Sequence, residues 1–310
     1  MNSSLGHLVA TENYYKYNNT NDSYENAGEI TPFILGWIAW MGITFLTCCI
    51  GLVGNGYIIW LLGFQIKRNC FTTFILNLAV ADFGFLTSVV INDIQLMTNF
   101  LGSTFLSHFC AFFSYMMFMN SHFLLAAISI DRCIVVLFPI WHHCSRPKHL
   151  STVVCIFLWV SSFLLNGSIM VFIVVFGYYN LFGLHFFLTA IVCIPSITLT
   201  TVVLFIKVCF KPKQQHKGQL LLMVLITLLC FLILAFPLNA FVLIVNFSNV
   251  QISPFLLHWE TGIIICACLN SSINPVIYFL VGRKKGAQSK ESMKTLLQNT
   301  FNESEATGGR

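Results

Sequence analysis

The chain has 310 residues, of which 57% are hydrophobic and only 9% are charged, and its formal net charge is +5. A soluble domain carries about 25% charged residues, so a water-soluble protein of this size could not cover its surface with so few charges. An integral membrane protein needs no such cover, because lipid surrounds it. The composition therefore excludes an ordinary soluble protein and predicts one that lies in a membrane.

The N-terminal arm, residues 1–32, is polar and lacks the apolar core of a cleaved signal peptide. We therefore expect the first span to act as an uncleaved insertion signal. Three sequons, NSS at Asn2, NNT at Asn18 and NDS at Asn21, predict N-glycosylation of this arm. The alternative is that the sequons are unused, because such triplets arise easily in an Asn-rich stretch.

Seven stretches are long and apolar enough to cross a membrane, since about 20 helical residues span roughly 30 Å of hydrocarbon. They cover about residues 33–62, 72–98, 106–137, 150–176, 181–209, 219–246 and 254–281. The predicted fold is all-α, a seven-transmembrane helix bundle over residues 33–281. Residues 282–310 follow as a tail, in which Met293, Leu296, Leu297 and Phe301 predict a short amphipathic eighth helix.

Basic residues occur in alternate connections between these spans. They are Lys67, Arg68, Arg146, Lys148, Lys207, Lys211, Lys213, Lys217, Arg283, Lys284 and Lys285. The other connections, near residues 99–105, 177–184 and 247–258, contain no Lys or Arg. The positive-inside rule then predicts an N-terminus on the outer side of the membrane and a C-terminus on the cytoplasmic side. The net positive charge follows from this topology and does not indicate nucleic-acid binding.

An acid near the middle of the second span, Asp82, must face the bundle interior and find polar partners there. Residues of similar expected depth are Ser121, Asn270, Ser271 and Asn274, together with Asn55 in the first span. A carboxylate ringed by hydroxyl and amide oxygens could bind a small hard cation such as sodium. The alternative is a structural hydrogen-bond network, and the sequence supports both. No other cofactor is expected.

Three prolines, Pro195, Pro237 and Pro275, interrupt otherwise regular apolar helices. Proline removes a backbone hydrogen bond and kinks a helix, and in a membrane bundle a kink allows a helix end to swing. Kinks close to a buried polar network favour a bundle with two arrangements. Static packing geometry is the alternative.

Several motifs together carry a family resemblance. They are GNGYIIWLLGFQIKRN (54–69), FILNLAVADF (74–83), DRC (131–133), FPIWHHCSRPKHLS (138–151) and NSSINPVIYFLVG (270–282). The chain resembles the rhodopsin-like G-protein-coupled receptors and, through the run after the third span, their Mas-related group. The resemblance covers about residues 33–300. It implies a receptor for an extracellular peptide or small ligand that activates heterotrimeric G proteins, and no enzyme activity.

The resemblance also implies roles for individual residues. Asp131 would pair with Arg132 and hold the receptor inactive, and Arg132 would contact the G protein after activation. Further switch residues would be Asn274, Pro275, Tyr278, Pro237, Phe231 and Pro195. The chain departs from the broad family in three places: Cys110 has no cysteine partner in the second extracellular loop, Ala235 replaces a usual tryptophan, and Val203 replaces a tyrosine.

Ligands of the family enter from the extracellular side between the helices. Candidate contacts there are Asp93, Glu260, Tyr115, His185, Asn239 and Phe241. Asp93 and Glu260 are the only acids at this level, so a ligand with a cationic group is one expectation, and idle hydrated acids are the alternative. A channel or transporter would show inverted repeats, and none is visible. A receptor that modulates another receptor without a ligand of its own remains the second functional hypothesis.

Overall fold

The computed structural model describes residues 27–66, 68–98, 104–138, 140, 146–147, 149–177, 184–210, 218–247 and 254–283. Within these ranges nearly all residues are helical and none is in a strand. The helices are α2 (Ala27–Trp60), α3 (Cys70–Thr98), α4 (Thr104–Leu137), α6 (Leu150–Phe176), α7 (Leu184–Phe210), α8 (Gly218–Phe247) and α9 (Pro254–Arg283). A short π-helix, η1 (Leu61–Gln65), continues α2.

The seven-helix prediction is confirmed, and α6 has the predicted ends. The largest difference is at α2, which begins at Ala27 rather than near residue 33. Five helices contain a stretch long and apolar enough to cross a membrane, and the described parts of α8 and α9 contain shorter apolar stretches, Leu221–Ala235 and Ile264–Leu280. The predicted eighth helix and the three sequons lie outside the described residues.

Local signals explain two of the helix ends. At the start of α3 the Asn69 side chain accepts a hydrogen bond from the backbone N–H of Thr72 (2.7 Å), and the Thr72 hydroxyl accepts one from the backbone N–H of Asn69 (2.7 Å). This reciprocal pair satisfies two amides that a helix start leaves unpaired. The second end is the C-terminus of α6. This helix stops at Gly177, whose φ of 70° is left-handed and whose backbone N–H donates to the Ile173 carbonyl.

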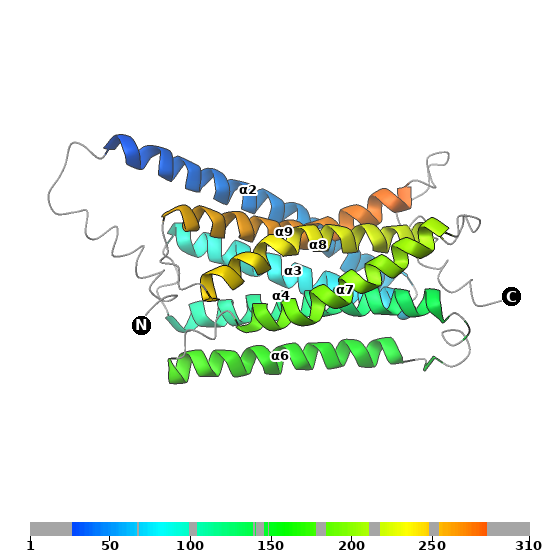
Figure 1. Ribbon diagram of the computed structural model, residues 1–310. Helices are drawn as coiled ribbons and strands as arrows, with labels where there is room; N and C mark the ends of the chain where they lie inside the picture. Colours follow the sequence, from blue (N-terminus) through cyan, green and yellow to red (C-terminus); the bar gives the residue numbers. More distant parts are fainter. Residues whose placement is uncertain are drawn as a thin grey trace.

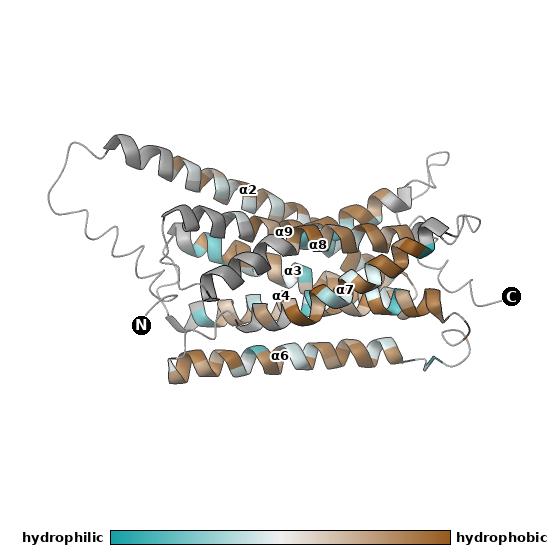
Figure 2. Ribbon diagram, in the orientation of Figure 1, coloured by the Kyte–Doolittle hydropathy of each residue, from teal (hydrophilic) through white to brown (hydrophobic). Residues whose placement is uncertain are grey.

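The helices form a bundle in which α4 packs against α3, α6, α7 and α8, and in Figure 1 α4 lies between α6 and the other helices. Helices α2 and α6 lie at opposite edges of the bundle in this view. Apolar residues dominate the helices in Figure 2, and many of them, such as Val53, Phe157 and Ile233, are exposed. Buried positions instead include charged and amide side chains. Apolar outside and polar inside is the arrangement that lipid contact favours.

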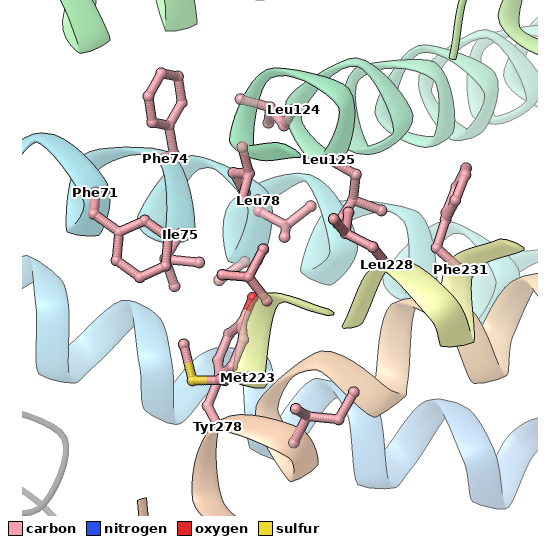
Figure 3. Packing of buried hydrophobic residues seen from close by; sticks show 14 of the residues in the cluster. Phe71, Phe74, Ile75, Leu78, Leu124, Leu125, Met223, Leu228, Phe231 and Tyr278 are labelled. Atoms are coloured by element: carbon pink, nitrogen blue, oxygen red, sulfur yellow. The ribbon is translucent and has the colours of Figure 1, made fainter. Parts of the chain in front are cut away.

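The largest buried cluster among the described residues draws side chains from every helix of the bundle, and Figure 3 shows its part at α3, α4, α8 and α9. Its labelled members include Phe71 and Leu78 from α3, Leu124 from α4, Leu228 from α8 and Tyr278 from α9. All five side chains are at most 3% exposed. This part of the cluster lies between the end of α4, which carries Arg132, and the middle of the bundle, which carries Asp82.

Helix α2 approaches α9 closely at Gly51. A Cβ atom on Gly51 would lie 2.5 Å from Cδ1 of Leu86 and 2.8 Å from Cβ of Ser272, and would also collide with the Ser272 hydroxyl. We expect Gly51→Ala to lower the free energy of unfolding by about 1–3 kcal/mol, because overpacking forces neighbouring side chains or helices apart. Thermal unfolding in detergent would measure the loss. Gly42→Ala is the control, because Gly42 lies in the same helix with nothing within 4 Å of its added Cβ. Equal stability of the two variants would contradict this packing.

Candidate functional site

The last turns of α4 bring together the acid and the arginine of the DRC motif. Arg132 donates through Nε (3.1 Å) and through Nη2 to the same carboxylate oxygen, Oδ2, of Asp131. The side chains are only 4% and 9% exposed, respectively. The Arg132 guanidinium also lies over the Phe71 ring, 4.4 Å from its centroid, where a cation–π contact adds to the ion pair. The capped start of α3 thus positions a second contact for Arg132.

A second arginine shares the same carboxylate. Arg146, which precedes α6, donates through Nη2 to Asp131 Oδ1 (2.7 Å) and to the Ser151 hydroxyl (2.8 Å). Its side chain is 6% exposed. In the sequence analysis Arg146 contributed only to orientation, so this contact is new. One signal was available: Asp131 is the only Asp or Glu between Asp93 and Glu260, so any nearby arginine had a single acid to pair with.

The middle of the bundle holds the predicted polar group around Asp82, which is fully buried. Ser121 Oγ donates to Asp82 Oδ1 (2.6 Å), and Asn274 Nδ2 donates to Oδ2 (2.8 Å). Ser271 of α9 is also buried, at 2% exposure. Three helices, α3, α4 and α9, therefore meet at one carboxylate, as the depths of these residues predicted.

Two more members of the predicted group are buried beside it. Asn55 Nδ2 donates to the Gly51 carbonyl within α2 and to the Ser271 carbonyl of α9, both at 3.0 Å. Asn270 is 3% exposed. The Asn55 bonds tie α2 to the part of α9 that carries Asn274 and Pro275. The carboxylate, hydroxyl and amide groups are a donor set that could hold a small hard cation or form a structural network.

Three further residues were predicted to belong to the switch: Tyr278, Pro275 and Pro195. Tyr278 is 3% exposed, and its ring lies beside Met223 in the buried cluster, with its hydroxyl directed into that cluster (Figure 3). Pro275 is buried inside α9. Pro195 lies within α7 but is exposed. The structure therefore places Tyr278 and Pro275 inside the bundle and Pro195 at its surface.

His122 is a buried residue of this level that the sequence analysis missed. It is 2% exposed, and its Nδ1 lies 2.8 Å from the Phe118 carbonyl. Its ring packs edge-on against Phe231, with 5.0 Å between the ring centroids. His122 follows Ser121 directly in α4, and Ser121 binds Asp82. His122 therefore connects this polar group with Phe231 of α8. A single histidine in an apolar run gave no sign of this contact.

Comparison with known proteins fits this arrangement. The family described as 7 transmembrane receptor (rhodopsin family) matches residues 54–278. Mas-related G-protein coupled receptor member H of Rattus norvegicus is 36% identical over 283 residues, 87% of this chain and 86% of that protein. Member D of Macaca fascicularis is 35% identical over 86% of each chain. Member X2 of Homo sapiens is 33% identical over 81% of this chain and 79% of that protein.

The chain belongs to the Mas-related G-protein-coupled receptors. Members of this family are receptors rather than enzymes, and they cross the membrane several times. The resemblance drawn from the sequence motifs is thereby confirmed, as is the membrane class drawn from composition. The polar groups described above are the internal network of this Mas-related receptor.

The residues predicted to contact a ligand lie only partly within the described part of the chain. Asp93 on α3 is partly buried, and its Oδ2 is a buried atom with no hydrogen-bond partner among the described residues. Tyr115 on α4 is partly buried. The side chains of His185, Asn239, Phe241 and Glu260, and that of Pro237, lie outside the description, although their positions fall within α7, α8 and α9.

Proposed function

We propose that this Mas-related receptor detects an extracellular ligand and activates heterotrimeric G proteins at the plasma membrane through Arg132. The N-terminus would be extracellular and the C-terminus cytoplasmic, as the distribution of basic residues favours. The observation that carries the proposal is the buried Asp131–Arg132 pair at the end of α4. A buried ion pair gains little net stability, so its presence at a helix end favours a role in switching.

In this proposal the resting receptor keeps Arg132 on Asp131 and Phe71. Activation moves the α8 and α9 ends near Pro237 and Pro275, and Tyr278 leaves its place in the buried cluster to stabilise the open arrangement. Arg132 then turns to the G protein. The support is the continuous contact from Asp82 through Ser121 and Asn274 to the proline-containing part of α9.

We further propose that the ligand is a peptide or small molecule with a cationic group that approaches Asp93 and Glu260. Tyr115, His185, Asn239 and Phe241 would surround the rest of the ligand. The buried Oδ2 atom of Asp93, which has no hydrogen-bond partner among the described residues, supports this, because a carboxylate oxygen out of water gains from a cationic partner.

A ligand screen tests the proposed function. Cells expressing the full chain would be exposed to Lys/Arg-rich peptides, small amines and matched uncharged compounds, with calcium and cAMP as readouts. We expect a receptor-dependent response to a cationic compound. A response only to uncharged compounds would contradict the ligand class. G-protein activation without any ligand would favour the second hypothesis, a receptor that modulates another receptor.

The Asp82 group leads to a separate prediction. Asp82→Asn keeps the size of the side chain and one acceptor oxygen, but it removes the charge and replaces the second acceptor by a donor amide. We therefore expect near-normal surface expression together with altered basal or ligand-driven signalling. If sodium binds Asp82 with Ser121, Asn270, Ser271 and Asn274, replacing sodium by a large organic cation should change signalling of the parent receptor and leave Asp82→Asn unaffected. Sodium-independent signalling of the parent would leave only the structural network.

A further inference from the structure

The end of α4 holds two cations and one anion. Asp131 Oδ2 binds Arg132, Asp131 Oδ1 binds Arg146, and all three side chains are at least nine-tenths buried. No other Asp or Glu occurs between Asp93 and Glu260, so α6, α7 and α8 carry no acid that could replace Asp131. The strength of the Asp131–Arg132 ion pair therefore depends on how far Arg146 also binds the Asp131 carboxylate.

Departure of Arg132 raises a problem for Asp131. Removing one partner from a buried ion pair is strongly destabilising, because the other charge stays buried without compensation. Here the second oxygen keeps a partner, since Arg146 contacts Oδ1 and does not depend on Arg132. Arg146 is fixed independently by its bond to Ser151 at the start of α6. Asp131 would thus remain paired in both arrangements of Arg132.

We propose that Arg146 is a positioning residue that compensates Asp131 when Arg132 leaves, and so makes the switch accessible. This rests on the proposed function of Arg132. It predicts that loss of Arg146 impairs coupling, because Asp131 would then hold Arg132 with both oxygens and be stranded without it. If Arg146 were only an additional clamp on the resting receptor, its loss would increase ligand-free coupling instead.

A first experiment needs neither ligand nor G protein. Arg132→Ala imitates the departure of Arg132, so the thermal unfolding of the full chain in lipid nanodiscs would be compared for Arg132→Ala, Arg146→Gln and the double variant. Each single change leaves Asp131 one partner. We expect the double variant to lose about 5 °C or more beyond the sum of the single shifts. Adding Asp131→Asn should remove this excess. Additive shifts would overturn the proposal.

A second experiment measures coupling. Nanodiscs would be tested for capture of nucleotide-free heterotrimeric G proteins, one from each Gα class. We expect Arg146→Gln to weaken capture about tenfold, Arg146→Lys to restore part of it, and Arg146→Gln to have no further effect in an Asp131→Asn background. Arg68→Gln is the control, because Arg68 is an exposed arginine after η1.

The outcomes separate the two proposals. Stronger capture by Arg146→Gln, or an equal loss in the Asp131→Asn background, would overturn the role of Arg146 while leaving G-protein coupling intact. If the parent receptor captures no G protein of any class, the proposed function fails. The unfolding comparison still decides in that case whether Arg146 compensates Asp131.

Discussion

Arg132→Ala is expected to abolish G-protein activation while the receptor reaches the cell surface in near-normal amounts. Coupling would be lost because, in the proposed function, the guanidinium turns to the G protein. Arg146, the other described arginine that contacts Asp131, is held by Asp131 and Ser151 and would not replace it. Folding would survive because Asp131 keeps Arg146 as a partner. Loss of the contact with Phe71 would cost about 0.5–2 kcal/mol.

The measurement is nucleotide exchange on the G protein in membranes, for basal activity and for a compound found by screening, with surface expression read separately. Arg132→Lys keeps the charge but loses the planar, multiply donating guanidinium, so partial activity is expected. Arg68→Ala, which removes an exposed arginine, should behave like the parent. Full signalling by Arg132→Ala at normal expression would show that the DRC motif does not transmit the signal.

Hydropathy was sufficient to predict the bundle, because a spanning helix needs a minimum apolar length. Hydropathy was least accurate at the helix ends, where the chain leaves the hydrocarbon and its residues need not be apolar. Residues 27–32 include Glu29 and Thr31 and lie beyond the apolar stretch, yet α2 already includes them. A helix can continue past the hydrocarbon into the interface, and its polar residues there give no hydropathy signal. The π-helix Leu61–Gln65 was likewise not predicted, since no residue pattern distinguishes it from an α-helical turn.

The polar site was predicted where depth alone decides contact. Asp82, Ser121 and Asn274 lie at one level of three helices, and a buried carboxylate must have partners. The contacts of Arg146 and His122 were missed for a different reason. Arg146 reaches Asp131 only because of the path of the chain before α6, and His122 meets Phe231 only because of how α4 faces α8. Neither rotation nor chain path follows from a one-dimensional pattern.

Asp93→Asn and Glu260→Gln should each weaken a cationic agonist at least about tenfold, whereas an uncharged agonist should be spared. Asp93 is partly buried, and its Oδ2 atom has no partner among the described residues. Charges attract more strongly in a poorly hydrated site than at an open surface. Removing one member of a buried charge pair costs about 2–5 kcal/mol, against less than about 1 kcal/mol for an exposed pair.

Dose–response curves for matched charged and uncharged agonists would measure these losses, with surface expression determined for every variant. Asp93→Glu is the matched control, because it keeps the charge while lengthening the side chain. Equal loss for charged and uncharged agonists would indicate a folding defect rather than a lost ion pair. Unchanged potency of the cationic agonist in both variants would show that these acids do not contact the ligand, and the cationic ligand class would then have no acidic partner at this level of the receptor.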